Sequence, residues 1–294
     1  MKIGWIGTGV MGAAMAGHLQ AAGHELFVFN RTRQRADSLV EKGARWCPAP
    51  ADVAAEAEII FTIVGFPGDV EKVYLGDEGV FSKRGACRIF VDMTTSTPSL
   101  AKNLEKKAEK QGMHSLDAPV SGGDIGAREG NLAIMVGGRK DVFKEVLPLL
   151  EVFGSRISYM GQAGAGQHTK MANQILISGT MVGVCESLLY AERQGLDQQA
   201  VIDIIGQGAA GSWSINNLGP RIVRGDYKSG FFVEHFVKDM GIALEEAAVL
   251  NLSLPGLALA HQLYLAVKAQ GHARSATQAL MLALKALNGG DFGE

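Results

Sequence analysis

The sequence predicts an α/β domain with a doubly wound, mostly parallel sheet, followed by an all-helical domain. Three observations support this prediction. Short apolar runs alternate with helical patterns over residues 1–162. The first of these runs leads through a glycine-rich turn into the first helical pattern. From residue 163 to the end at residue 294, long helical patterns dominate and no segment has a convincing strand pattern. Strand–helix alternation is typical of a parallel sheet with helices on both faces.

The individual elements follow from local signals. Continuous β-branched runs such as Glu58–Val64 indicate strands that are buried on both faces. Thr97 followed by Pro98 is typical of a helix start, and Gly112 of a helix end. The other expected strands are Lys2–Ile6, Glu25–Phe29, Ile89–Asp92, Met113–Asp117, Leu132–Val136 and Ile157–Met160. Further helices are expected at 11–22, 33–42, 167–194, 198–206, 233–251, 256–270 and 273–287. The helix at 167–194 is long, and we expect it to run between the domains.

The composition excludes several classes of protein. The formal net charge is −2 and neither domain is basic, which argues against a nucleic-acid partner. The three cysteines are far apart, and no Cys/His cluster predicts a metal site. The N-terminus lacks the apolar stretch of a signal peptide. The most apolar segment, about residues 171–191, contains Asn173, Gln174 and Glu186, which favours a buried helix over a membrane span. We therefore expect a cytoplasmic protein.

The turn after the first strand has the pattern G-x-G-x-x-G, which is typical of the Rossmann-type dinucleotide site. Gly7 permits the tight turn, Gly9 lets the backbone approach a pyrophosphate, and Gly12 allows the helix to pack on the strand. The start of the following helix offers free amides to the phosphates. The residues assigned to cofactor binding here are Gly7, Thr8, Gly9, Val10, Met11 and Gly12.

The end of the second strand indicates a preference for NADP over NAD. An NAD site usually carries a carboxylate there, to bind the ribose 2′-hydroxyl. This chain has Asn30, Arg31 and Thr32 instead. The guanidinium of Arg31 would attract a 2′-phosphate, and the other two side chains could donate hydrogen bonds. In the alternative interpretation Arg31 belongs to a solvated helix start and NAD is also used.

Two loops at strand ends are candidates for the rest of the cofactor site. Val64, Gly65, Phe66 and Pro67 follow the third long strand, where a loop can cover a dinucleotide. Thr94–Thr97 follows the next strand and could form hydrogen bonds near the nicotinamide. The alternative for both segments is ordinary turn chemistry.

Two glycine-rich segments are candidates for substrate binding. Ser121 offers a hydroxyl, and Gly122 and Gly123 can present backbone N–H groups to a small carboxylate. Gly206–Trp213 lies between helices of the second half, where the glycines beside Trp213 suggest a pocket wall. The alternatives are a tight turn for the first segment and a buried core tryptophan for the second.

The helix that opens the second half carries the candidate catalytic group. Lys170, Asn173 and Gln174 lie at i, i+3 and i+4 and share one helical face among apolar neighbours. Apolar surroundings and a nicotinamide cation would lower the pKa of Lys170 and make it a proton donor and acceptor near neutral pH. His168 is a weaker candidate because residues at i and i+2 do not face each other. The alternative is a surface lysine on the first turn.

Four ordered motifs resemble the β-hydroxyacid dehydrogenase family, which includes 3-hydroxyisobutyrate dehydrogenase, tartronate semialdehyde reductase and NADPH-dependent glyoxylate/succinic semialdehyde reductases. They are GTGVMG, DAPVSGG, GAGQHTKMANQ and the pair Lys238-Asp239, and together they span nearly the whole chain. The resemblance implies that Lys170 is the catalytic acid/base, that Ser121, Gly122 and Gly123 bind the substrate carboxylate, that Thr95 and Lys238 contact the cofactor, and that Asp239 lies at the substrate end. Many relatives have Asn where this chain has Gln174.

These observations predict an NADP-dependent oxidoreductase that interconverts a short hydroxy acid and its aldehyde acid. Asn173 and Gln174 would orient the middle of the substrate. The rival interpretations are an imine reductase, a non-catalytic NADP-binding module and a phosphosugar-acid dehydrogenase. The retained Lys170 argues against the first two, and the chain lacks the extra C-terminal region of the third. The excess of apolar helices, together with the resemblance, predicts a homodimer or homotetramer.

Overall fold

The chain divides into two compact units, residues 1–170 and 171–294. The computed structural model describes residues 1–83, 85–228 and 230–289. The first turn of the long helix α8 (Ala165–Arg193) belongs to the first unit and the rest of this helix to the second. The boundary between the units therefore lies within α8, whereas the sequence predicts it between residues 162 and 163, before this helix. The helix start lies with the first unit because Gln167 forms hydrogen bonds to residues of that unit.

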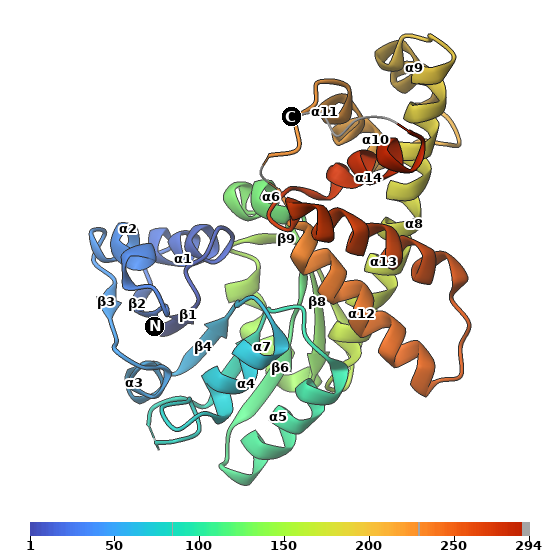
Figure 1. The fold of residues 1–294 in the computed structure, drawn as a ribbon. Coiled ribbons are helices and arrows are strands. Elements are labelled where there is room, and N and C mark those ends of the chain that lie inside the picture. The colour runs from blue at the N-terminus through green and yellow to red at the C-terminus, as the bar shows by residue number, and fades with distance from the viewer. Residues whose placement is uncertain (84, 229, 290–294) are drawn as a thin grey trace. The chain divides into compact units, whose positions relative to one another are not determined.

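One sheet organises the first unit (Figure 1). Its order is β3-β2-β1-β4-β5-β6-β8-β7, with β9 paired to β8. Strands β1 to β6 pair with one another in parallel, whereas β8 is antiparallel to both β6 and β7 and parallel to β9. The prediction of a doubly wound, mostly parallel sheet is therefore confirmed. The strands are β1 (Lys2–Ile6), β2 (Glu25–Phe29), β3 (Arg45–Trp46), β4 (Ile59–Thr62), β5 (Ile89–Asp92), β6 (His114–Asp117), β7 (Val120–Ser121), β8 (Leu132–Gly138) and β9 (Gly154–Gly161).

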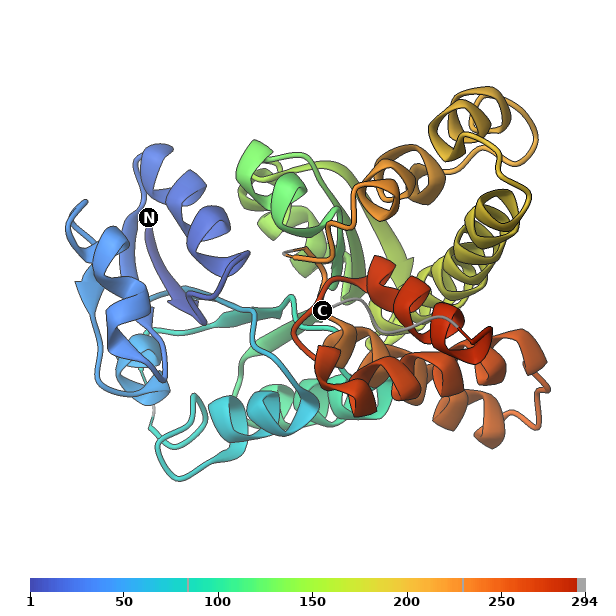
Figure 2. The same cartoon turned by 45° about the horizontal axis from the view of Figure 1, so that its top comes forward.

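Helices cover both faces of this sheet and create two separate apolar cores. One core joins the sheet to α1 (Gly12–Ala21), α2 (Asp37–Val40) and α7 (Lys140–Leu150). The other joins it to α3 (Pro50–Glu56), α4 (Pro67–Leu75) and α5 (Pro98–Lys110). In Figure 2, α1 and α2 lie on one side of the strands, and α4 and α5 on the other. The short α6 (Gly123–Glu129) follows β7.

Local signals predicted the boundaries of α1 and α5, whereas α3, α4, α6 and α7 were not predicted. Thr97 caps α5, since its Oγ1 accepts a hydrogen bond from the Leu100 N–H at 3.2 Å, as predicted. The helix expected at 33–42 is instead a 3-10 turn, Arg33–Ala36, followed by the single turn of α2. Neither segment has a side-chain cap, so nothing local extends the helix.

The second unit is helical in the part that the structure describes. Apart from one isolated bridge between Phe232 and Ala276, those residues form no strand. α8 is long and apolar enough to cross a membrane by length and composition, but its buried residues Met181, Cys185 and Leu188 pack into the core of this unit. The other helices are α9 (Gln198–Ile205), α10 (Trp213–Asn217), α11 (Gly219–Val223), α12 (Val233–Val249), α13 (Pro255–Val267) and α14 (Leu280–Leu287).

Candidate active site

The glycine-rich turn after β1 lies against the loop after β4, where the strand order reverses. A Cβ on Gly7, whose φ is +97°, would lie 2.1 Å from the carbonyl oxygen of Ile63. A Cβ on Gly12 would lie 2.0 Å from the carbonyl oxygen of Gly7. At Gly9, by contrast, no described atom lies within 4 Å of the Cβ position. Doubly wound sheets bind ligands at such a switch point, and the open side of this turn is at Gly9.

Hydrogen bonds from neighbouring elements fix the shape of this turn. The indole N–H of the buried Trp5 donates to the Gly7 carbonyl at 3.0 Å, and the Thr8 N–H donates to Asn30 Oδ1 at 3.0 Å. Thr8 is 2% exposed, and its hydroxyl has no hydrogen-bond partner among the described residues. An open backbone, a helix start and a buried, unpartnered hydroxyl fit the pyrophosphate of a dinucleotide.

After β2, Asn30 shapes the glycine-rich turn, whereas Arg31 reaches solvent. The Asn30 amide is occupied on both sides, since its Nδ2 donates to the Thr32 carbonyl at 2.8 Å. Arg31 is largely exposed and forms an ion pair of 2.9 Å with Asp69. Exposed ion pairs contribute little to stability, so the guanidinium can exchange this carboxylate for a phosphate.

The loops after β4 and β5 are joined through Thr94. The Val64 N–H donates to Thr94 Oγ1 at 3.0 Å, and the Thr94 N–H donates to Asp92 Oδ1 at 3.0 Å. Thr94 is buried, whereas Thr95 is half-buried and Phe66 is exposed. Thr94 therefore shapes the two loops, and Thr95 remains the residue that can reach a bound molecule.

The loop after β6 presents backbone at the surface. Ser121 ends the short strand β7 and is half-buried. Gly122 and Gly123 have φ values of +132° and +63°, which favour glycine over other residues. This backbone leaves the Ser121 hydroxyl and the two glycine N–H groups in one short segment, as carboxylate binding requires.

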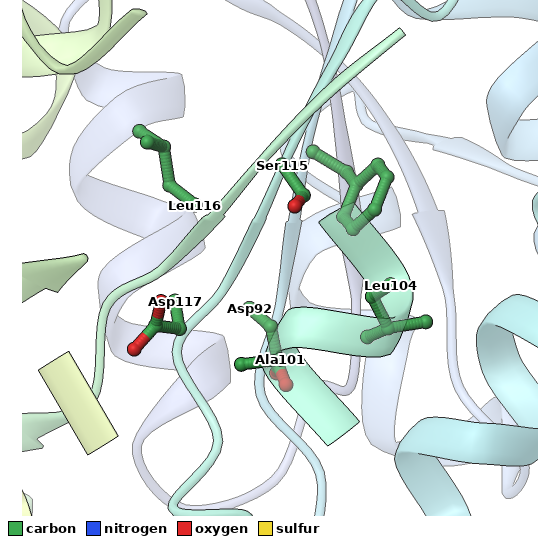
Figure 3. A pocket seen from close by; sticks show the side chains of 7 residues that line it. Asp92, Ala101, Leu104, Ser115, Leu116 and Asp117 are labelled. Atoms are coloured by element: carbon green, nitrogen blue, oxygen red, sulfur yellow. The ribbon is translucent and has the colours of Figure 1, made fainter. Parts of the chain in front are cut away.

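Two buried carboxylates lie side by side beneath these loops. Asp92 and Asp117 are paired residues of the parallel strands β5 and β6 and are 5% and 4% exposed. A cavity of about 10 Å³ lies beside them, also lined by Leu104 and Ser115 (Figure 3). A space of this size holds at most one water molecule, so it is not the substrate pocket.

Asp117 holds the start of α8. Its carboxylate accepts hydrogen bonds from the Gly164 N–H at 2.7 Å and from the Gln167 N–H at 2.9 Å. Burial raises the pKa of Asp117 to about 6, although these N–H donors lower it. Lys170 follows in the same helix and is 6% exposed, which excludes the surface-lysine alternative. A buried lysine needs partners or a ligand.

The second unit contains a buried polar cluster that includes four of the predicted residues. Gln174 Nε2 donates to Asp239 Oδ2 at 2.7 Å, and Asn173 Nδ2 donates to Gln174 Oε1 at 2.7 Å. Lys238 Nζ lies 3.0 Å from Asp239 Oδ1. Asp239, which is 1% exposed, thus connects an amide of α8 to the lysine that precedes it on α12.

Two further candidates differ in their environment. His168 is exposed, in contrast to Lys170 on the same helix. Trp213 is 62% exposed and is the first residue of α10, which excludes the core-tryptophan alternative. All three cysteines are buried and free, and within the described ranges no three His, Cys, Asp or Glu residues gather as metal ligands.

Three residues contribute to the site without being predicted from the sequence, namely Trp5, Asp117 and Gln167. Asp117 and Gln167 stand inside the motifs DAPVSGG and GAGQHTKMANQ. The available signal was a polar residue at the end of the buried strand β6 or in the first turn of an otherwise apolar helix. Such residues have to find buried partners.

Comparison with known proteins places both units in one family. Residues 2–161 match the NAD binding domain of 6-phosphogluconate dehydrogenase, and residues 164–284 match the model described as NAD-binding of NADP-dependent 3-hydroxyisobutyrate dehydrogenase. The chain belongs to the β-hydroxyacid dehydrogenase family. A probable 3-hydroxyisobutyrate dehydrogenase-like protein from Arabidopsis thaliana is 49% identical over 98% of this chain and 86% of its own.

Two further relatives align with this chain over nearly their whole lengths. The 2-hydroxy-3-oxopropionate reductase of Escherichia coli is 37% identical over 97% of both chains. The structure of Mycobacterium tuberculosis 3-hydroxyisobutyrate dehydrogenase with L-serine covers 97% of this chain and 99% of its own, with a TM-score of 0.87 and 30% identity. This member of the β-hydroxyacid dehydrogenase family is thus an NAD(P)-dependent dehydrogenase with a Rossmann-type domain and a helical domain.

Proposed function

We propose that this chain is an NADP-preferring reductase of short aldehyde acids that also runs in reverse as a dehydrogenase of the 3-hydroxy or 4-hydroxy acid. The observation that carries the proposal is the burial of Lys170, at 6% exposure, one turn before the amides Asn173 and Gln174 in a continuous helix. Lysine is mostly exposed in proteins, so a buried lysine on the same helical face as two amides is unusual. A lysine in this position serves as the proton donor to a carbonyl oxygen and as the acceptor in the reverse direction.

The residues divide the work of the reaction. The nicotinamide cofactor, when bound, supplies or accepts the hydride. The Ser121 hydroxyl and the N–H groups of Gly122 and Gly123 bind the substrate carboxylate. Lys170 holds the proton that the carbonyl oxygen receives. Asn173 is fixed by its hydrogen bond to Gln174 and orients the polar middle of the substrate.

The ion pair of Lys238 and Asp239 has a supporting role in this proposal. Asp239 accepts from Gln174 Nε2 and pairs with Lys238, which is 12% exposed at its side chain. The pair fixes the Gln174 amide at a single orientation, and Lys238 is assigned to the cofactor by family resemblance. Trp213, exposed at the start of α10, is assigned to the substrate pocket wall.

Replacement of Lys170 tests the proposed chemistry. Lys170→Ala should lower kcat by about 10²–10⁴, as is typical for loss of general acid–base catalysis, while the Kd for NADPH stays near the wild-type value. His168→Ala is the matched control, because His168 is exposed on the same helix, and its kcat should stay within about 2-fold of wild type. Wild-type turnover of Lys170→Ala would refute the role of the lysine.

The NADP preference rests on Arg31 and on the absence of a carboxylate at the end of β2. The family model matched by the second unit is described as NADP-dependent, which supports this preference. Loss of a charge-assisted hydrogen bond costs about 1.5–3 kcal/mol, so Arg31→Ala should lower the NADPH/NADH ratio of kcat/KM by about 10- to 100-fold. An unchanged ratio would refute the assignment.

A substrate screen would show which acid the enzyme uses. Initial rates with NADPH and NADH should be compared for succinic semialdehyde, glyoxylate, tartronate semialdehyde and methylmalonate semialdehyde, and in the reverse direction for 3-hydroxyisobutyrate and serine. We expect the aldehyde acids to be reduced with NADPH. Reduction of cyclic imines without turnover of any of these acids would instead support the imine reductase alternative.

We also propose that the chain forms a homodimer or homotetramer through its helical unit. Several large apolar side chains of that unit are more than half exposed, namely Leu176, Tyr190, Ile204, Val249, Leu250 and Leu287. Burying them against a second copy would remove apolar surface from water. Light scattering during gel filtration would test this, and a monomeric mass at micromolar concentration would refute it.

A further inference from the structure

The fully buried Gln167 connects the loop after β5 to the start of α8. Its Oε1 accepts a hydrogen bond from the Ser96 N–H at 3.0 Å, and its Nε2 donates to the Thr94 carbonyl at 2.8 Å. Gln167 is 0% exposed. The two ends of one amide therefore clamp the backbone on both sides of Thr95, so the carbonyl before it and the N–H after it are held at fixed positions.

The backbone of Gln167 is itself held by Asp117. Its N–H donates to Asp117 Oδ2, and the Gly164 N–H donates to Asp117 Oδ1. Glycine backbone packs closely against Asp117: a Cβ on Gly137 would lie 2.6 Å from Asp117 Oδ1, and a Cβ on Gly166 would lie 2.5 Å from the Asp117 carbonyl. The carboxylate is thus enclosed by glycine backbone and fixes the first turn of α8 onto the end of β6.

The same network extends to the loop after β4. Thr94, whose carbonyl Gln167 binds, accepts the Val64 N–H through its own hydroxyl and donates its N–H to Asp92. Backbone from the ends of β4, β5 and β6 is therefore linked to one turn of α8 by buried hydrogen bonds. Every one of these residues lies within the first unit.

We propose that Gln167 and Asp117 are positioning residues that place the proton donor Lys170 and the cofactor-side residue Thr95 in a fixed relation to each other. The inference rests on the proposed function, which assigns those two roles. Lys170 lies three residues after Gln167 in the same helix, so a shift of the first turn moves the lysine with it. Thr95 stands between the two backbone groups that the Gln167 amide holds.

A glutamine that only filled space would not need the hydrogen bonds that Gln167 forms with Ser96 and Thr94. An amide that only filled space could be replaced by a methionine of similar volume at little cost to catalysis. A positioning amide needs one acceptor toward Ser96 and one donor toward Thr94. A protonated carboxylic acid offers the same pair of groups, whereas an ionised carboxylate offers acceptors only and repels the Thr94 carbonyl.

This difference gives a test with a pH signature. The kcat of Gln167→Glu, relative to wild type at the same pH, should be lowered about 10- to 100-fold at pH 8.5 and should recover to within about 3-fold at pH 6, because burial favours the protonated acid. Gln167→Met should be lowered at both pH values. In both variants kcat should fall more than the affinity for NADPH, which is measured by fluorescence titration.

Gln278→Glu is the matched control. Gln278 is also 0% exposed, and its Nε2 donates to a backbone carbonyl, that of Asp226, at 2.9 Å, but it belongs to the second unit and takes no part in the hydrogen bonds of this network. Its kcat per folded enzyme, relative to wild type, should be the same at pH 6 and pH 8.5. A ratio for Gln167→Glu that does not change with pH, or a wild-type kcat for Gln167→Met, would overturn the proposal.

Amide hydrogen exchange separates this inference from the proposed function. If the wild-type protein turns over no aldehyde acid with NADPH, the proposed function fails, but the clamp can still be measured. Gln167→Met should accelerate exchange at the Ser96 N–H, which loses its acceptor, while strand amides of β1 keep their protection. Unchanged exchange at Ser96 would overturn the inference on its own.

Discussion

Replacing Asp117 by asparagine should change how the stability of the first unit depends on pH. Burial raises the pKa of this carboxyl from 3.8 to about 6, against the opposing effect of the Gly164 and Gln167 N–H donors. A carboxyl whose pKa is raised on folding stabilises the folded state when it is protonated. This contribution is fully present below pH 3.8 and is lost as the pH rises through about 6.

The size of the effect follows from the two pKa values. At pH 8 the group is ionised in both the folded and the unfolded state and contributes no difference between them. At pH 5 it is mostly protonated when folded and mostly ionised when unfolded, which stabilises the folded state by about 1.4 kcal/mol relative to pH 8. The carboxamide of the Asp117→Asn variant does not titrate, so the variant lacks this contribution.

Urea unfolding at pH 5, 6, 7 and 8 would measure the contribution of Asp117 to the free energy of unfolding. Both proteins should carry Trp213→Phe, which leaves Trp5 and Trp46 as the fluorescent residues, so that the signal reports on residues 1–170. The free energy of unfolding of wild type minus that of Asp117→Asn should increase by about 1.4 kcal/mol between pH 8 and pH 5. A difference that is equal at all four pH values would show that Asp117 has an ordinary pKa and would refute the reasoning.

Substitutions of glycine and threonine residues test three further parts of the structure. Gly166→Ala should lower the free energy of unfolding by about 3 kcal/mol, because the added Cβ would lie 2.4 Å from the Met135 carbonyl oxygen. In the same helix, the Cβ of Gly179→Ala would meet no described atom within 4 Å, so this variant should have a free energy of unfolding about 1 kcal/mol higher than wild type. Equal urea midpoints for the Gly166→Ala and Gly179→Ala variants would contradict both expectations. Gly9→Val should leave the thermal midpoint nearly unchanged but weaken NADPH binding at least about 100-fold, and an unchanged Kd would remove the phosphates from this turn. Thr94→Val removes the acceptor of the Val64 N–H and should lower kcat about 10-fold. Thr97→Val removes the cap of α5 and the acceptor of the exposed Ser99 hydroxyl, and it should lower stability by about 1 kcal/mol with kcat unchanged.

Local signals were sufficient wherever one short segment decided the structure. The G-x-G-x-x-G turn predicted both the tight bend at Gly7 and the start of α1, and the pair Thr97-Pro98 predicted the start of α5. The two-residue strands β3 and β7 were missed because runs this short carry no periodicity. The antiparallel pairing of β8 depends on neighbours that the sequence pattern does not reveal.

The buried network was not predictable for a different reason. Gln167 lies 71 residues from Ser96 and 50 residues from Asp117, so no local pattern connects them. The spacing of Lys170, Asn173 and Gln174 predicted a shared helical face, but not that Gln174 is bound to Asp239, 65 residues away. Single positions and their chemistry were visible in the sequence, whereas their partners depend on the completed fold.

Burying the hydrogen-bonded side chains of Asp117 and Gln167 costs free energy, which indicates that they position the start of α8 rather than stabilise the fold. Keeping Asp117 ionised at neutral pH opposes folding, because burial disfavours its charge. Apolar side chains of similar volume would fill this space at lower cost, but apolar contacts are non-directional and tolerate small rotations of a helix. Hydrogen bonds to fixed backbone N–H and carbonyl groups are directional, so they restrict the first turn of α8 in rotation as well as in translation. A proton donor that must meet a carbonyl oxygen within a few tenths of an ångström requires that restriction, which explains why buried polar groups are placed at this junction.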